Sequence, residues 1–388
     1  MIRTLAVHGY RSLRDLVLPL GPLTVVTGAN GSGKSSLYQA FRLLAGTVTG
    51  DLIGSLAVAG GLDSVLWAGP ETISPAMRRG EVAVTGTTRR QPISLQLGFS
   101  GDDLGYLIDI GLPSPQQTTM FSRDPQVKRE LIWAGPVLRP GSLLLQRRNG
   151  ALRLRGEDDR FTELGTGLSP RDSVLGRGGD LAICPELAAV RANVVSWRFH
   201  DQIRTDPQAP ARRPQIGTWS PVLDHGGDNL APALQTIRES AYATTLDSVL
   251  DRAFPGSRLQ VTETDGWFGL TLLQPGLLRP LGAGELSDGT LRFLALAAAL
   301  LSPQPPALLV LNEPETSLHP DMLPAVAELI SQAVSRIQMV VVTHSTELAT
   351  RLADREGTLW HELAKESGQT VVIDQGLLSR PTWQWGRR

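Results

Sequence analysis

The feature that most constrains this chain is a glycine-rich stretch near its N-terminus. Residues 28–35 read Gly-Ala-Asn-Gly-Ser-Gly-Lys-Ser, in which two glycines enclose four residues and are followed by Lys and Ser. Glycine lets backbone N–H groups approach phosphate oxygens because no side chain blocks them. Lys34 adds a positive charge for the outer phosphates, and the Ser35 hydroxyl is placed to hold Mg²⁺. The stretch therefore predicts a phosphate-binding loop.

The flanking residues support this prediction. Residues 23–27 read as a buried strand, and residues 36–45 read as a helix whose N-terminus would face the anion. A glycine-rich turn that binds nothing is disfavoured, because strand, loop and helix follow in the order that the motif requires. We expect the nucleotide to contact Gly28, Ala29, Asn30, Gly31, Ser32, Gly33, Lys34, Ser35 and Ser36.

Composition narrows the class of protein. The 388 residues are 41% hydrophobic and carry a formal net charge of −1, which is ordinary for a globular protein and does not indicate nucleic-acid binding. No apolar stretch is long enough for a signal peptide or a membrane span. The single Cys184 excludes an intrachain disulfide and a Cys-rich zinc site, so we expect a cytoplasmic protein. We also expect the pairs Arg147-Arg148 and Arg212-Arg213 to be solvated.

Short alternating segments dominate the first third of the chain. Residues 2–7 and 16–20 read as two strands, which we expect to share a sheet edge with the strand that enters the phosphate loop. Three further strands are expected over 81–85, 93–99 and 106–110. Polar or glycine-containing turns separate them, which favours an antiparallel meander over βαβ units.

The middle of the chain has fewer clear patterns. A hairpin is expected over 143–155 around Asn149-Gly150, and a second over 258–273 around Asp265-Gly266. Helices are expected at 186–195, 230–240 and 245–254, and 206–214 reads as an exposed loop. No heptad run long enough for a coiled coil occurs.

A second group of chemically informative residues follows. Leu286-Ser287-Asp288-Gly289 opens an apolar helix, where the Ser287 hydroxyl and backbone N–H groups would meet an anion; a capped core helix is an equal alternative. The aliphatic run 307–311 reads as a strand buried on both faces, and Glu313 beyond its end is our candidate general base rather than a surface glutamate. The strand 339–342 ends at His344, which would bind a γ-phosphate or an attacking water. Ser287, Glu313 and His344 are 26 and 31 residues apart, each step holding a helix and a strand.

The order of these motifs resembles that of the ATP-binding-cassette ATPases. More narrowly, the string Glu-Pro-Glu-Thr-Ser-Leu-His-Pro at 313–320 and the element Tyr10-Arg11-Ser12 are similar to those of the SMC/RecF/overcoming-lysogenisation group. The chain also resembles bacterial AAA-type predicted ATPases. The resemblance implies an α/β P-loop NTPase fold with a mixed central sheet and an antiparallel β meander, split by a large α+β insertion. Residues 1–112 and 275–388 would form the ATPase head, and 113–274 the insertion.

The resemblance also implies a composite site that binds ATP and Mg²⁺ between two protomers of a homodimer. Residues 28–36, Arg11 and Ser12 would bind the nucleotide, with Glu313 and His344 catalytic in the same protomer. Ser287, Asp288 and Gly289 would act on the partner's nucleotide, and Ser35 and Asn312 would serve the metal. The family has Asp where this chain has Asn312, so we expect weak Mg²⁺ binding and slow hydrolysis. Candidates for the family's coupling glutamine are Gln116, Gln117 and Gln146.

Several cellular roles are compatible with such a head. We favour an ATP-gated dimer in DNA maintenance, repair or phage defence, by fold analogy. The alternatives are a nucleotide sensor that works with a separate effector, which Asn312 favours, and a transporter subunit, which the insertion disfavours. A nuclease is disfavoured because the segment after His344 is short. Nucleic acid could contact Trp133, Trp197, Trp219 and the 143–155 hairpin, although core packing is the favoured role of these tryptophans.

Overall fold

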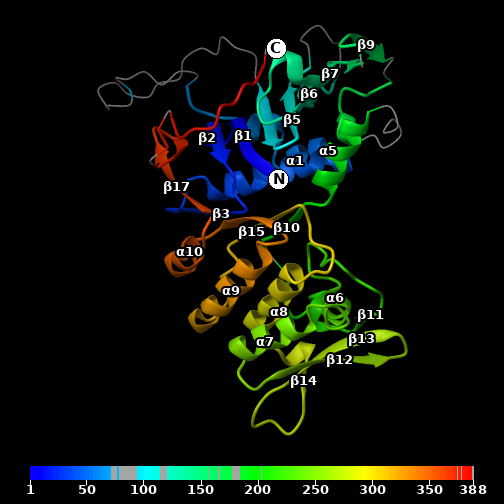
Figure 1. Ribbon diagram of the computed structural model, residues 1–388, viewed down its shortest axis with the longest axis vertical. Coiled ribbons are helices and arrows are strands. Elements are labelled where there is room, and N and C mark those ends of the chain that lie inside the picture. Colours follow the sequence, from blue (N-terminus) through cyan, green and yellow to red (C-terminus); the bar gives the residue numbers. More distant parts are fainter. Residues whose placement is uncertain are drawn as a thin grey trace. The chain divides into compact units, whose positions relative to one another are not determined.

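The computed structural model describes two compact units (Figure 1). The first comprises Met1–Gly21, Val26–Trp197 and His361–Arg388, and the second comprises Pro22–Val25 and Arg198–Trp360. Strand β3 (Leu23–Gly28) begins in the second unit and ends in the first. The described residues are 1–70, 77, 94–113, 120–156, 158–164, 167–176, 184–201, 203–373, 375–376 and 378–386.

An eight-stranded antiparallel sheet dominates the first unit. Its order is β2-β1-β4-β5-β6-β7-β8-β9. The strands are β1 (Ile2–Tyr10), β2 (Leu13–Pro19), β4 (Leu95–Gly101), β5 (Leu104–Gly111), β6 (Gln126–Ala134), β7 (Leu143–Arg148), β8 (Ala151–Arg155) and β9 (Phe161–Leu164). The meander is confirmed, and so is the hairpin at Asn149, whose φ of 51° suits a tight two-residue turn. The strand expected over 81–85 lies outside the described residues.

Helices cover this sheet next to the phosphate loop. They are α1 (Lys34–Thr49), α2 (Leu52–Val58), α3 (Leu62–Val65) and α5 (Pro185–Val195), with short 3₁₀ turns η1 (Pro140–Ser142) and η2 (Val174–Gly176). Trp197 contacts Phe41 of α1 and Phe99 of β4, with ring centroids 6.3 and 5.3 Å apart. The aromatic cluster fixes the helix that follows the loop against the sheet.

Strand β3 does not join β1 and β2, contrary to our expectation of one shared edge. Its last residues neighbour β17 (Thr358–Glu366), which pairs with β18 (Gln369–Val372). Leu23–Val26 are all buried, as in a central strand that is covered on both faces, so β3 does not fit the edge of a meander.

The second unit contains the other parallel strands. β10 (Arg198–His200), β15 (Leu308–Asn312) and β16 (Gln338–Val342) pair in parallel, and the first residues of β3 follow β16. α6 (Leu230–Arg238), α7 (Ala243–Ala253), α8 (Asp288–Leu300), α9 (Leu323–Ala333) and α10 (Thr346–Ala353) supply most of one apolar core. A small sheet of β11 (Gln215–Ile216), β12 (Arg258–Thr264), β13 (Trp267–Leu273) and β14 (Leu281–Gly282), and 3₁₀ turns η4 (Pro210–Arg212), η5 (Ala283–Glu285) and η6 (Pro320–Met322), complete it.

The two units do not follow the segment boundaries at 112 and 274 that we expected. Strands β6 to β9 continue the sheet beyond β5, because each satisfies the backbone hydrogen bonds of the strand before it. Helix α6 packs against α8 in the second unit, so residues 198–274 share a core with the C-terminal motifs. Among the described residues, no helix is long and apolar enough to cross a bilayer.

Candidate functional site

The phosphate loop joins β3 to α1 in the first unit, as predicted. Lys34 is buried, and its Nζ donates to the carbonyls of Gly28 at 2.5 Å and Ala29 at 3.0 Å. The ammonium group therefore lies over the loop, bonded to its own backbone. Gly28, Gly31 and Gly33 have φ values of 147°, 77° and 113°, which side chains other than glycine rarely adopt.

This loop fits a nucleotide phosphate. Helix α1 has 16 residues and starts at Lys34, so its first N–H groups have no carbonyl partner within the helix. The hydroxyl Oγ of Ser32 is buried with no hydrogen-bond partner among the described residues. Unpaired donors, a helix N-terminus and an ammonium group thus converge where an anion would bind.

Strand β18 supports the loop from its outer side. The Thr370 hydroxyl lies 2.7 Å from the Ser32 carbonyl and 2.8 Å from the Ser12 hydroxyl, and Thr370 N donates to the Ser12 carbonyl at 2.7 Å. A Cβ on Gly33 would lie 2.1 Å from Thr370 Oγ1. Ser12 is therefore brought to the loop, whereas Arg11 is exposed with its guanidinium 5.4 Å from the Tyr10 ring. No sequence pattern indicated Thr370, which is 338 residues from Ser32.

The candidate catalytic pair forms in the second unit. Glu313 follows β15 with a φ of 52°, and its N–H donates to the Val342 carbonyl at 2.7 Å. His344 Nε2 lies 2.7 Å from Glu313 Oε1, and both side chains are partly exposed. Neighbouring parallel strands thus bring these two residues together, as their positions after β15 and β16 suggested.

Glu315 holds the backbone that carries His344. Its Oε1 accepts hydrogen bonds from Thr343 Oγ1 at 2.7 Å, His344 N at 2.8 Å and Ser345 N at 3.2 Å. The sequence indicated Glu315 only as part of the family string. A carboxylate with three donors fixes the turn after β16, so it sets the direction in which the imidazole points.

We call Ser287, Asp288 and Gly289 the signature residues, and Leu286–Gly289 the signature loop. The signature residues form the N-terminus of α8. Ser287 Oγ accepts a hydrogen bond from Thr290 N at 3.1 Å, so Ser287 caps helix α8, as one of the two alternatives predicted. The cap does not decide whether the same residues also bind an anion. A Cβ on Gly289 would lie 2.7 Å from the Ser317 carbonyl, and Arg292 Nη1 donates to the Thr316 carbonyl at 3.1 Å. The signature loop therefore packs against the turn that follows Glu313.

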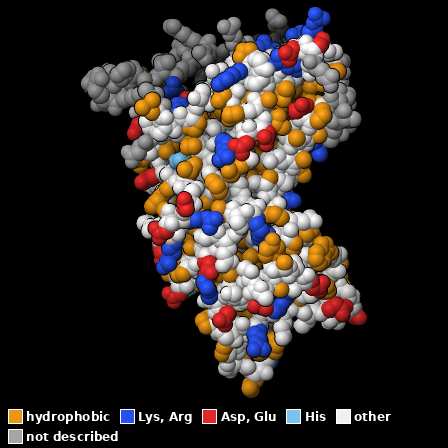
Figure 2. All heavy atoms as spheres, viewed as in Figure 1, with side chains coloured by type: hydrophobic (Ala, Val, Ile, Leu, Met, Phe, Trp, Pro, Cys, Tyr) orange, Lys and Arg blue, Asp and Glu red, His pale blue; other side chains and the backbone are white. Residues whose placement is uncertain are grey.

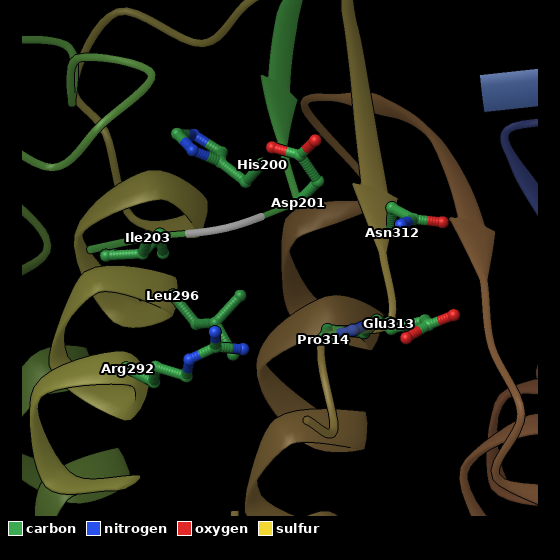
Figure 3. Close-up of a pocket in the computed structure, with 8 residues that line it drawn as sticks. All are labelled: His200, Asp201, Ile203, Arg292, Leu296, Asn312, Glu313 and Pro314. Carbon is green, nitrogen blue, oxygen red and sulfur yellow. The ribbon is translucent and has the colours of Figure 1, made fainter. Parts of the chain in front are cut away.

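A small pocket lies beside Asn312 and Glu313 (Figure 3). Its cavity volume is about 20 Å³, enough for one water. His200 Nδ1, Arg292 Nε and Asn312 Oδ1 are buried without a hydrogen-bond partner among the described residues. Burial lowers the pKa of His200 to about 4, and the charges of His225 and Arg198 act in the same direction, so the ring is neutral at pH 7. The other lining residues are Asp201, Ile203, Leu296, Glu313 and Pro314.

The candidate metal ligands fit Mg²⁺ unequally. Ser35 is exposed in the first turn of α1, where its hydroxyl suits a cation bound beside a phosphate. Asn312 offers a buried, unpartnered amide oxygen but no negative charge. The described part of the chain contains no cluster of three or more acidic, His or Cys ligands.

Two arginines that we expected in solvent are largely covered. Arg147 is fully buried, with Nη1 2.8 Å from Glu130 Oε2, and the Arg212 side chain is only 11% exposed. Arg148 and Arg213 are exposed as expected. The ionic partners of Arg147 and Arg212 lie 17 and 76 residues away in sequence, so a local pattern could not reveal them.

The candidate nucleic-acid contacts are divided. Trp133 and Trp197 are buried, while Trp219 is 62% exposed. On the face shown in Figure 2, cationic and anionic side chains are interspersed in both units. Gln116 and Gln117 lie outside the described residues, and Gln146 is on β7. This face therefore shows no basic stripe of the kind that binds a phosphate backbone.

A family model matches the segments that carry both groups of candidate site residues. The model, described as "AAA domain, putative AbiEii toxin, Type IV TA system", covers residues 23–124 and 202–350, more than half of the chain. The chain belongs to this AAA-domain family. In this member, the matched segments contain the phosphate loop, the signature residues, Glu313 and His344.

Individual relatives match shorter stretches. The OLD nuclease of Thermus scotoductus is 46% identical over 48 residues, which are 12% of this AAA-domain chain and 9% of that protein. The phosphate import ATP-binding protein PstB of Streptomyces coelicolor is 27% identical over 159 residues, 40% of this chain and 56% of that protein. The chain thus spans about half of the length of PstB and a small part of the length of the OLD nuclease.

A solved structure supports the fold over nearly the whole chain. The crystal structure of an Smc head bound to the C-winged helix domain of ScpA matches with a TM-score of 0.50 and 15% identity, covering 97% of this chain and 98% of that chain. At this identity the likeness concerns the fold alone. It confirms the predicted P-loop ATPase fold of the SMC-head type.

Proposed function

We propose that this AAA-domain chain is an ATPase head that closes as a homodimer around ATP and Mg²⁺ and reopens after hydrolysis. The observation that carries the proposal is the phosphate loop, with Lys34 held at the carbonyls of Gly28 and Ala29. Its backbone N–H groups would bind phosphate oxygens, together with the ammonium group. Mg²⁺, when bound at Ser35 and Asn312, would offset phosphate charge.

Hydrolysis would depend on Glu313 and His344. His344 holds one carboxylate oxygen of Glu313, so the other oxygen would accept the proton of an attacking water. Glu315 would keep the imidazole in place through the His344 N–H. The family resemblance supports the use of this pair on the nucleotide that the phosphate loop holds.

The signature residues would complete the site of a second copy. Ser287 and Asp288 are exposed, which leaves them accessible to a partner, and Gly289 lies beside them in the first turn of α8. A twofold dimer would present each signature loop to the partner's nucleotide, so one self-complementary interface would form two sites. ATP would then stabilise the dimer, and its hydrolysis would release it.

Glu313→Gln tests both parts of this proposal. The variant keeps the shape of the side chain but loses the base, so we expect phosphate release to fall at least about 100-fold and ATP to trap a dimer. Phosphate release and sedimentation with and without ATP measure these effects, and Glu347→Gln on the exposed face of α10 is the control. Phosphate release at the wild-type rate would remove Glu313 from the mechanism, and failure to dimerise with ATP would refute the ATP-closed dimer.

For the cellular role we propose DNA maintenance, repair or phage defence in the cytoplasm, with nucleic acid or a separate effector as partner. The short stretch shared with the OLD nuclease favours a role that involves nucleic acid, and the family description names a putative toxin of a type IV TA system. The likeness to PstB favours the transporter alternative, and Asn312 favours a nucleotide sensor. Phosphate release with and without DNA or RNA separates the first role from the sensor, and copurification with a membrane protein would indicate the transporter.

A further inference from the structure

Arg212 forms hydrogen bonds with the signature loop, although the two are distant in sequence. Its Nη1 donates to the Leu286 carbonyl at 2.7 Å, and its Nη2 donates to Asp288 Oδ1 at 2.5 Å. The guanidinium therefore bonds the residues on either side of Ser287. Longer contacts of 3.4 and 3.3 Å reach the carbonyls of Ala283 and Gly284.

The same guanidinium makes a further hydrogen bond through its Nε. Nε donates to the Thr205 carbonyl at 2.7 Å, in the segment between β10 and η4. One planar group thus connects the chain that leaves the parallel sheet with the turn that opens α8. The turns η4 and η5 also contact each other, so the hydrogen bonds of Arg212 are part of a larger packing contact between the two segments.

Neither Leu286 nor Ser287 adopts a conformation that would itself fix this loop. Their φ values of −73° and −66° with ψ values of 146° and 157° are ordinary extended backbone. Local hydrogen bonds from Thr290 N to Ser287 Oγ and from Leu286 N to the Ala283 carbonyl hold part of this loop, and tertiary hydrogen bonds add to them. The charged bonds of Arg212 are the strongest of these, because an ionised donor and acceptor roughly double the strength of a hydrogen bond.

We propose that Arg212 is a positioning residue that holds Leu286–Gly289 in the shape that receives a partner's nucleotide. This inference rests on the proposed ATP-closed dimer. Arg212 itself would touch neither ATP nor metal; it would act through Ser287 on the second copy. Loss of Arg212 would therefore weaken ATP-driven closure and leave nucleotide binding at the loop of the same protomer intact.

The neighbouring Arg213 provides a matched control. It is exposed, and its side chain makes no hydrogen bond or ion pair within the described part of the chain. In a Glu313→Gln background, Arg212→Ala should raise the ATP concentration needed for dimerisation about tenfold, and Arg213→Ala should leave it unchanged. Both variants should bind a fluorescent ATP analogue as monomers with wild-type affinity. Arg212→Lys should not restore dimerisation, because one ammonium cannot span both acceptors.

Mixed protomers test whether Arg212 acts on the partner. A dimer of Arg212→Ala with Lys34→Ala has one site with an intact phosphate loop and an intact signature loop. At an ATP concentration too low to close the Arg212→Ala dimer, the mixture should therefore release phosphate faster than either variant alone. Ser287→Arg mixed with Lys34→Ala should behave in the same way. Recovery with Ser287→Arg but not with Arg212→Ala would overturn the role of Arg212. Absence of recovery in both mixtures would refute the shared site itself, and with it this inference.

Hydrogen exchange in the protein without nucleotide gives an independent measurement. Backbone N–H groups at 283–289 should exchange faster in Arg212→Ala than in Arg213→Ala, since the hydrogen bonds of Arg212 are lost. Equal exchange in the two variants would show that Arg212 does not order this loop.

Discussion

The phosphate loop and the signature loop are both turns that open a helix, but different interactions hold them. The phosphate loop is shaped by three glycines of positive φ and by Lys34, all within six residues of one another. The signature loop is in ordinary extended conformation and is held by Arg212, which is 76 residues from Asp288. The first is determined by its own sequence, whereas the second combines a local N-cap at Ser287 with a contact that depends on how the second unit packs.

Lys34→Ala is the strongest test of this difference between the two loops. The variant removes a charged donor from the loop, and we expect ATP affinity to fall about 100-fold, since a charged hydrogen bond contributes about 1.5–3 kcal/mol. The stability of the second unit should not change, because the loop belongs to the first. Titration with a fluorescent ATP analogue and hydrogen exchange of both units measure this.

The control for Lys34→Ala is Lys365→Ala, which removes an exposed ammonium from β17. It should bind ATP with wild-type affinity. Unchanged affinity in Lys34→Ala as well would mean that the loop binds no phosphate, and the proposed function would then lose its main support.

Acidification should affect the second unit, whereas Lys34→Ala affects the first. The pKa of His200 is lowered to about 4 in the folded state, so the unfolded chain takes up this proton near pH 6.5 and the folded chain does not. The stabilising effect is full above pH 6.5 and is lost as pH falls toward 4. We expect a loss of about 2 kcal/mol at pH 5 in the unfolding free energy of the second unit, measured by hydrogen exchange.

His200→Gln should remove most of that pH dependence, because glutamine does not titrate. The matched control is His319→Gln, which removes an imidazole that is 71% exposed from the same unit. An equal acid response in His200→Gln and the wild-type protein would show that another group controls the stability of this unit.

The same contrast explains what the sequence could predict. The phosphate loop, the buried strands β15 and β16 and the N-cap at Ser287 depend on neighbouring residues, and local patterns identified them. Thr370, Glu315 and Arg212 act through partners that are distant in the chain. No spacing or propensity indicates such contacts, because they exist only once the sheets and helices have packed.

The boundaries of the units have the same explanation. Strands β6 to β9 resemble an insertion in the sequence because their pattern is irregular, yet each adds to the open edge of the sheet already formed. Arg147 is buried because its strand, β7, pairs with β6. Glu130 on β6 supplies the opposite charge. Buried pairs of this kind follow from strand register, which the sequence does not specify by itself.

Asn312→Asp sharpens the comparison with the smallest expected effect. The amide oxygen of Asn312 is buried without a partner among the described residues, and Asp201 lines the same pocket. A second carboxylate there would be desolvated and repelled, so the variant should be less stable without metal. With Mg²⁺ and ATP, the added charge should strengthen Mg²⁺ binding and raise turnover about tenfold.

Thermal unfolding with EDTA or Mg²⁺, and phosphate release over a range of Mg²⁺ concentrations, measure the two effects of Asn312→Asp separately. A variant that loses stability without metal and regains it with Mg²⁺ and ATP would show that position 312 faces the metal. If neither the Mg²⁺ requirement nor the rate changes, Asn312 limits neither metal binding nor hydrolysis. The pocket beside Asn312 would then be a structural cavity of the second unit. Like the Arg212 contact to the signature loop, this cavity would depend on how that unit packs.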